Sequence, residues 1–242
     1  MIIERFEDDD ALSSALATRV LQTIVARPAL VLGLPTGRTP LGLYRELRER
    51  SRGDRISWSQ VKTFNLDEFA GLDHSHPNSY RVYMQAELFD HVSIDAANIG
   101  FLDGAAPDLL AECRRYEDAI AAAGGIDLQI LGIGANGHIG FNEPAEGLCA
   151  FTHVAELEQE SREANAQRFG GDWTNVPSRA LSMGMATILN AREIVLIATG
   201  AEKADAVHGM IEGLITPRLP ASLLQVHPRV TVMLDSAAAE RL

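Results

Sequence analysis

Runs of apolar residues recur along the chain, and a longer amphipathic stretch separates each run from the next. Residues 29–34 are continuously apolar, as expected of a strand that is covered on both faces. Residues 126–131, 193–198 and 230–234 are further mainly apolar strand candidates. The stretch 10–26 instead repeats apolar residues at helical spacing. This alternation predicts an α/β fold with a mostly parallel central sheet between layers of helices.

The remaining segments fit the same plan. No internal repeat, low-complexity tract or linker divides the chain, so residues 1–242 are expected to form a single domain. Two further strands are expected over 61–66 and 152–157, and helices are expected over 40–50, 78–89, 108–123, 161–168 and 202–213.

The charge balance excludes some classes of partner. The chain has 21 Lys and Arg against 33 Asp and Glu, a formal net charge of −12. This argues against nucleic acid, which needs a basic face, although a phosphate in one cleft needs only a few donors. No apolar run approaches the ~18–20 residues of a membrane span, and the first residues lack a signal-peptide pattern. A cytoplasmic protein that does not contact a membrane is expected.

Cysteine chemistry is not indicated. Cys113 and Cys149 are far apart in the sequence and form no CxxC pair. Two cysteines make no disulfide framework, and no zinc-ligand spacing is present. We therefore expect two reduced thiols and no metal site.

The first polar motif is the segment 34–40, LPTGRTP, which directly follows an expected strand. Gly37 permits a tight turn and a close approach to a ligand. Thr39 is expected to cap the following helix and Pro40 to be its first residue. Free amides at such a helix start favour an anion, although an ordinary strand-to-helix turn would have the same residues.

The second motif is the segment 64–69, FNLDEF, at the end of another expected strand. Its adjacent carboxylates, Asp67 and Glu68, can supply a base, a metal ligand or only solvated charge. Apolar neighbours such as Phe64 and Phe69 are expected to raise the pKa of a carboxyl group here, which suits proton abstraction.

The third motif is the segment 132–144, GIGANGHIGFNEP. Four glycines within nine residues indicate that the backbone passes close to a ligand. His138 is a natural proton carrier near neutral pH, and Glu143 can orient it or hold its proton. The run begins with GxG but lacks the GxGxxG spacing of a dinucleotide site, so a nicotinamide cofactor is rejected.

The fourth motif is the segment 198–203, ATGAEK. Gly200 ends an expected strand, and Lys203 is expected in the first turn of the next helix. A cation there opposes the helix dipole, so it indicates either a bound phosphate or pairing with an acid such as Glu202.

All four motifs follow the carboxyl ends of expected strands. Ligands of open α/β sheets bind along that edge. We therefore expect the four segments to meet in one cleft.

The motifs together resemble glucosamine-6-phosphate deaminases. The resemblance rests on LGLPTG-x-TP, FNLDEF, GIGANGHIGFNEP and TG-x-x-K in this order, and it extends to segments 76–84, 175–189 and 224–228. It implies a Rossmann-like three-layer sandwich with a mobile lid over about 145–175. It also implies conversion of glucosamine 6-phosphate to fructose 6-phosphate and ammonia, without any cofactor.

The resemblance implies roles for residues that move protons. Asp67 would transfer a proton between C2 and C1 of the sugar, His138 would open the pyranose ring, and Glu143 would support His138. Asn136 stands where many members have Asp, so it is expected to orient His138 by hydrogen bonding rather than by charge.

The resemblance also implies a phosphate site. Gly37, Arg38 through its backbone amide, and Thr39 would hold the phosphate, while Arg168 and Lys203 would pair with its charge. Arg38 stands where a small residue is usual, and its side chain is expected to point to solvent.

Several alternatives remain open. The chain ends soon after its last expected strand, and no basic pair follows the NEP sequence, which resembles the non-allosteric branch of the family. Rival functions are a deaminase for galactosamine 6-phosphate or another epimer, a catalytically inactive sugar-phosphate sensor, and a 6-phosphogluconolactonase. Both a monomer and a homo-oligomer are compatible with the sequence.

Overall fold

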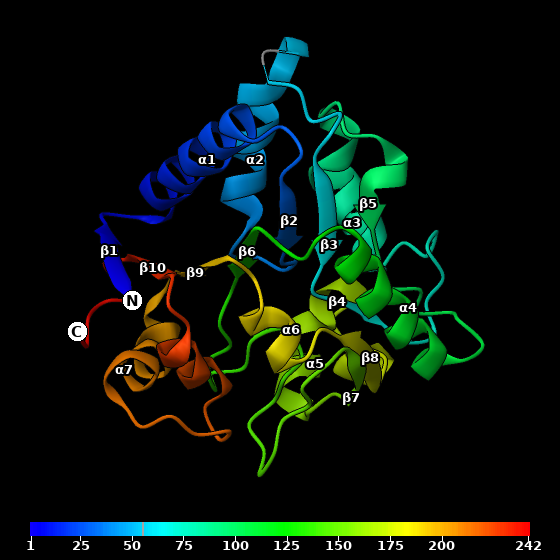
Figure 1. Ribbon diagram of the computed structural model, residues 1–242. Helices are drawn as coiled ribbons and strands as arrows, with labels where there is room; N and C mark the ends of the chain where they lie inside the picture. The colour runs from blue at the N-terminus through cyan, green and yellow to red at the C-terminus, as the bar shows by residue number, and fades with distance from the viewer. Residues whose placement is uncertain (55) are drawn as a thin grey trace.

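A computed structural model describes residues 1–54 and 56–242. Within them, a central sheet of seven strands is parallel throughout (Figure 1). In spatial order the strands are β1 (Ile2–Phe6), β10 (Val230–Asp235), β9 (Glu193–Ala198), β6 (Leu128–Leu131), β2 (Val31–Leu34), β3 (Lys62–Asn65) and β5 (Ile99–Gly100).

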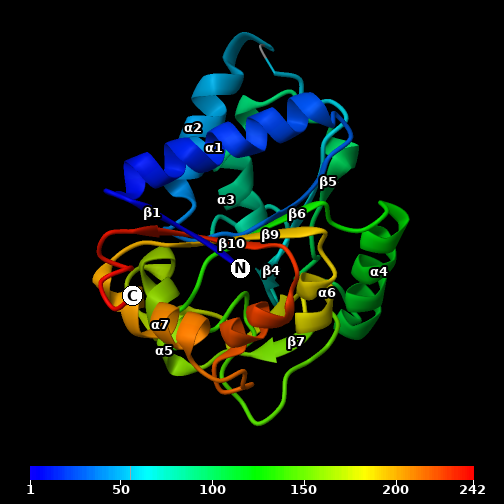
Figure 2. The ribbon, with the colours of Figure 1, turned by 60° about the vertical axis from the view of Figure 1, so that its left-hand side comes forward.

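Helices cover both faces of this sheet, as Figure 2 shows with the sheet nearly edge-on. One face carries α1 (Asp9–Ala26), α2 (Leu41–Ser51) and α3 (Tyr80–Glu87), and the other carries α4 (Leu109–Ala122), α6 (Met185–Leu189) and α7 (Ala204–Glu212). Alternate strand residues serve the two faces. Val195 packs in the core beneath α1 and α2, whereas Ile194 and Leu196 pack in the core beneath α4 and α7. The predicted three-layer α/β architecture is therefore confirmed.

A second, smaller sheet lies at one end of the molecule. It consists of β4 (Asp67–Phe69), β8 (Arg179–Ser182) and β7 (His153–Glu156), all antiparallel to their neighbours. Ser182 lies opposite Asp67, and its hydroxyl oxygen accepts a hydrogen bond from the amide of Phe141 at 3.0 Å. Through this contact the small sheet is joined to the segment that carries His138. Helix α5 (Gln159–Asn165) follows β7.

Short 3₁₀ turns complete the described structure. They span Arg52–Asp54, Phe89–His91, Ala96–Asn98, Ala166–Phe169, Trp173–Asn175, Ala201–Lys203 and Pro220–Val226. None of the helices described in residues 1–54 and 56–242 combines the length and apolar character needed to cross a membrane. Both cysteines are free thiols, as expected.

Some sequence-based boundaries were wrong. The strand β1 was not predicted, because its residues are partly exposed at the sheet edge and only pairing with β10 makes them a strand. The expected helix over 161–168 is α5 followed by a 3₁₀ turn. The expected helix over 202–213 begins with a 3₁₀ turn that ends at Lys203, so this residue caps α7 instead of lying in its first turn.

The start of α2 also differs from the expectation. The helix begins at Leu41, and Pro40 occupies the capping position, with no side-chain capping bond. The amide of Leu41 instead bonds to the carbonyl oxygen of Arg38 at 3.1 Å. Thr39 therefore does not cap the helix, because a turn from Arg38 to Leu41 places the helix start one residue later than expected.

Candidate active site

The carboxylate of Asp67 lies where three of the predicted segments meet. Its Oδ1 is 3.5 Å from the hydroxyl oxygen of Thr36, in the loop after β2. Its Oδ2 lies 3.8 Å from the place where a side chain at Gly140 would begin. The loops that follow β2 and β6 therefore both reach the start of β4, and the side chain of Asp67 is buried between them.

Burial changes the acidity of Asp67. Removal from water raises its pKa to about 7, the negative charge of Glu68 adds to the rise, and the hydrogen bond from Thr36 opposes it. A carboxyl group with this pKa can both accept and return a proton near neutral pH, which is the property a general base needs.

The neighbouring carboxylate faces away from this cleft and anchors a helix. Glu68 accepts hydrogen bonds from the amides of Phe69, Tyr80 and Arg81 at 2.8, 2.9 and 3.0 Å. Two of these amides open α3, where a negative charge is favourable. Burial raises the pKa of Glu68 to about 7 even though these amides oppose the rise. Asp67 thus lies in the cleft, whereas Glu68 binds the backbone at the start of α3.

His138 belongs to a chain of hydrogen bonds. Its Nδ1 lies 2.8 Å from Oδ1 of Asn136, and Nδ2 of Asn136 donates to Oε2 of Glu143 at 3.1 Å. Because the amide of Asn136 gives its hydrogen to the carboxylate, its oxygen faces the ring and can only accept. Nδ1 of the neutral ring therefore carries the hydrogen, and Nε2 is left to accept or donate a proton.

Two glycines of this segment lie where a side chain would not fit. A side chain at Gly134 would begin 2.3 Å from the ring of His138. Gly137 has a φ of 86°, in the left-handed region that favours glycine. Gly134 is thus required by the packing of the His138 ring, whereas a side chain at Gly137 would begin 2.3 Å from Leu219.

Glu143 is held ionised beside this ring. Its Oε2 lies 3.4 Å from Nδ1 of His138. Burial raises the pKa of Glu143, but the hydrogen bonds and charge from His138, with those from Ser161 and Asn136, outweigh burial and leave the pKa below its ordinary value. Ser161 was not predicted from the sequence, because nothing in the local pattern of 157–165 distinguishes its hydroxyl from a surface serine.

The loop 34–40 is fixed by two tyrosines that were not predicted as part of the site. Gly37 has a φ of 101°, and its carbonyl oxygen accepts a hydrogen bond from the hydroxyl of Tyr83 at 2.7 Å. The hydroxyl of Tyr44 donates to the carbonyl oxygen of Pro35. The side chain of Arg38 is exposed, as expected. The loop therefore keeps its shape through its carbonyl groups, and among the described residues nothing accepts a hydrogen bond from the amides of Gly37, Arg38 and Thr39.

Arg168 reaches the same loop through an aromatic ring. Its guanidinium carbon lies 5.2 Å from the ring centre of Tyr83, the residue that bonds to Gly37. Its Nη2 donates to the carbonyl oxygens of Asn78 and Ser79, both at 3.1 Å, while its buried Nε has no hydrogen-bond partner among the described residues. Arg168 thus has an unused donor, and its guanidinium group lies next to the tyrosine that holds the loop.

Lys203 lies near the start of α7. Burial lowers its pKa, and Glu202 and Glu160 oppose that change. Glu160 belongs to α5, so Lys203 and α5 are neighbours. Within residues 1–54 and 56–242, no hydrogen bond joins Lys203 to the loop 34–40.

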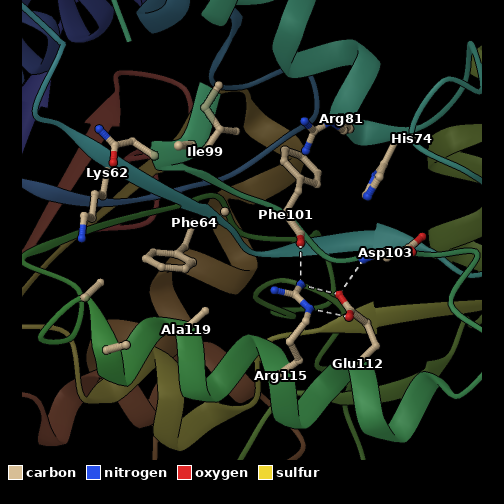
Figure 3. A pocket seen from close by; sticks show the side chains of 15 residues that line it. Lys62, Phe64, His74, Arg81, Ile99, Phe101, Asp103, Glu112, Arg115 and Ala119 are labelled. Atoms are coloured by element: carbon tan, nitrogen blue, oxygen red, sulfur yellow. Dashed lines mark hydrogen bonds and ion pairs between the residues drawn. The ribbon is translucent and has the colours of Figure 1, made fainter. Parts of the chain in front are cut away.

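A separate hollow lies between α4 and strands β3 and β5 (Figure 3). Its volume is about 630 Å³. Arg115 donates to the carboxylate of Glu112 and to the carbonyl oxygen of Phe101, so its main donors are already paired. None of the predicted site residues lines this hollow. In the described part of the chain, no group of three or more His, Cys, Asp or Glu side chains is arranged to hold a metal ion.

The fold is that of an α/β enzyme, and a buried carboxylate near an oriented imidazole is an arrangement suited to moving protons on a small molecule. The chain belongs to the family described as glucosamine-6-phosphate isomerases/6-phosphogluconolactonase, whose family model matches residues 7–233. It is 47% identical to a glucosamine-6-phosphate deaminase of Clostridium novyi over all of both chains. It is 48% identical to glucosamine-6-phosphate deaminase 2 of Bacillus subtilis, over 100% of this chain and 96% of that one.

Solved structures agree with this assignment. A monomeric glucosamine-6-phosphate deaminase is 42% identical, superimposes with a TM-score of 0.96, and is covered over 100% of both chains. A 6-phosphogluconolactonase from Trypanosoma cruzi shares the fold with a TM-score of 0.76 but only 21% identity, over 100% of this chain and 96% of that one.

Proposed function

We propose that this protein converts glucosamine 6-phosphate and water to fructose 6-phosphate and ammonia. The observation that carries the proposal is the placement of a buried carboxylate with a pKa of about 7 beside the segment that holds an oriented His138. Relatives named as glucosamine-6-phosphate deaminases at 43–48% identity over almost the full chain support the same substrate.

His138 opens the sugar ring in this proposal. Nε2 takes the proton of the C1 hydroxyl and returns it to the ring oxygen, so the bond between C1 and the ring oxygen breaks and an aldehyde forms. The imidazolium that exists between these two transfers is stabilised by the carboxylate of Glu143, 3.4 Å from Nδ1. Asn136 keeps the ring in the orientation that leaves Nε2 available.

Asp67 then moves a proton from C2 to C1. It removes the C2 proton, the bonding pair forms a double bond between C1 and C2, and the C1 oxygen gains the proton that the ammonium group on C2 gives up. Return of the proton to C1 leaves an iminium group at C2. Water adds there and ammonia departs, which gives the ketose without net oxidation. A base near its own pKa performs both halves of this transfer, and such catalysis contributes about 10²–10⁴-fold.

The phosphate is held by the loop after β2 and by two cations. The amides of Gly37, Arg38 and Thr39 supply hydrogen bonds, and Arg168 and Lys203 supply charge. The unpartnered Nε of Arg168 beside the loop supports this role. Residues 1–242 form a single domain in this proposal, and residues 145–175 form its mobile lid. Movement of the lid would bring helix α5 and Arg168 over the substrate, close to Lys203.

The test is ammonia release from glucosamine 6-phosphate, with galactosamine 6-phosphate measured alongside. We expect release from the first sugar and, in heavy water, incorporation of deuterium at C1 of the product. Faster release from the galacto epimer would replace the proposed substrate. Thermal stabilisation by either sugar phosphate without release of ammonia would indicate a sensor and overturn the proposal.

A further inference from the structure

Helix α5 contributes one side chain to the hydrogen-bond chain of His138. The hydroxyl of Ser161 donates to Oε1 of Glu143. The other carboxylate oxygen, Oε2, receives the amide of Asn136 at 3.1 Å. Each oxygen of Glu143 therefore has its own donor, one from the segment that carries His138 and one from α5.

The setting of Ser161 indicates a specific contact and not a chance surface bond. The residue is only 2% exposed, and the side chain of Glu143 is only 10% exposed. A buried carboxylate needs donors to remain ionised, and hydrogen bonds to charged groups are stronger than those between neutral groups. Replacing the hydroxyl would leave Oε1 of Glu143 buried without this donor.

The charged groups around this contact are few. The ionisable group that faces Glu143 is His138, and the donors Asn136 and Ser161 are neutral. On α5 itself, Glu160 precedes Ser161 and interacts with Lys203 at the start of α7. A change at Ser161 should therefore be transmitted to His138 through Glu143.

We propose that Ser161 is a positioning residue that completes the proton-transfer chain of His138 only when α5 lies over the active site. This inference rests on the proposed deaminase function. It links the position of the lid to ring opening. The carboxylate of Glu143 stabilises the charged ring of His138 fully only when the Ser161 hydroxyl on α5 donates to that carboxylate. Water is also kept from Glu143 in that state, since Ser161 is buried against it.

The first test is Ser161→Ala, which removes the donor and leaves no new bulk. We expect kcat to fall about tenfold, the order of effect of one hydrogen bond to a charged group, with a small change in KM. Without the donor, the pKa of Glu143 rises and its carboxylate is protonated at a higher pH. The acidic limb of the kcat profile should therefore move to higher pH. Ser161→Thr, which keeps the hydroxyl, should recover most of both effects.

The matched control is the next residue on the same helix. Arg162 bonds to the carbonyl oxygens of Thr174 and Val176 and does not contact Glu143. Arg162→Gln keeps the Ser161 hydroxyl and a side-chain donor that can face the same carbonyl oxygens, so it should leave the pH profile unchanged. In a Glu143→Gln background, Ser161→Ala should change kcat less than about twofold further, because residues that act through one another are not additive.

The outcomes separate this inference from the function beneath it. If the unmodified enzyme releases no ammonia, the function fails. If it does, and Ser161→Ala either behaves as the parent or loses activity with an unmoved pH profile, the positioning role is overturned. An additive loss in the Glu143→Gln background would overturn it as well. Should the alanine variant not fold, Ser161→Cys, a weaker donor of similar size, gives the same comparison.

Discussion

The large and small sheets contribute to the active site in different ways. The central strands β2, β6 and β9 of the seven-stranded sheet are buried at nearly every position, and the site residues that follow them lie in loops beyond their carboxyl ends. The three-stranded sheet instead carries a site residue within a strand, at Asp67 in β4. The large sheet thus positions the loops after β2 and β6, and the small sheet positions the carboxylate of Asp67 between those loops.

Asp67 and Glu68 show this difference at the scale of two residues. Because successive side chains of a strand point to opposite faces, one carboxylate enters the cleft and the other turns to the amides that open α3. Both have a pKa of about 7 through burial. The comparison predicts a kinetic role for the first and a stabilising role for the second.

The largest expected effect is on activity in Asp67→Asn. The amide fills the same space but cannot accept a proton, so ammonia release should fall by about 10²–10⁴-fold. Exchange of the C2 proton with heavy water should be lost, while the sugar phosphate should still raise the melting temperature. Retained C2 exchange would show that another group is the base.

Glu68→Gln is the isosteric counterpart. Both carboxylate oxygens of Glu68 accept hydrogen bonds from backbone amides. The NH₂ group of the glutamine would therefore face the N–H of Tyr80 or Arg81, and two donors would meet without an acceptor. One buried donor left unpaired costs about 1–3 kcal/mol. Denaturant unfolding should show this loss, with kcat per folded enzyme changed less than about tenfold. A larger loss of activity than of stability would remove the distinction between the two carboxylates.

Asp67→Asn should also change the pH dependence of stability. The pKa of Asp67 is about 7 in the folded protein and 3.8 ordinarily, so the folded state binds more protons between these values. The contribution of this raised pKa to the free energy of unfolding is therefore complete below pH 3.8. It is lost as the pH rises through about 7. The melting temperature of Asp67→Asn relative to the parent should therefore be higher at pH 8 than at pH 5. If the difference in melting temperature were the same at both pH values, the pKa of Asp67 would not be raised in the folded protein.

Asn136→Asp tests the loop side of the comparison. A carboxylate beside Nδ1 of His138 would favour the charged ring. Activity should stay within about tenfold of the parent, and the limb of the pH profile that reports His138 should move to higher pH. An unmoved profile would show that position 136 has no electrostatic influence on the ring.

The sequence predicted the large sheet better than the small one for a physical reason. A strand buried on both faces, such as 193–198, is apolar at nearly every position, and its nature is local. The strand β4 has Asp67 and Glu68 in a run of three residues, and only pairing with β8 makes it a strand. Likewise, β1 depends on β10. Composition could not reveal pairing between segments more than a hundred residues apart.

The same limit applies to the site. Gly37, His138 and Glu143 were predicted because their motifs are unusual in themselves. Thr36 and Ser161 are ordinary hydroxyl residues whose partners lie 31 and 18 residues away. Their importance depends on burial and on the direction of one bond, and neither property is present in local sequence.

The smallest expected effect is that of Arg38→Ala, which separates the backbone of the phosphate loop from its side chains. The side chain of Arg38 is exposed, and an exposed charge interacts weakly through water. If the loop holds phosphate through amides alone, KM should change less than about twofold, and that small change should vanish at high salt because ions screen exposed charges. Arg168→Lys is the matched comparison, since it keeps the charge but loses the planar donors beside Tyr83, and its KM should rise more. A larger rise in KM for Arg38→Ala than for Arg168→Lys would place the phosphate on the exposed side of the loop, away from the cleft that Asp67 enters.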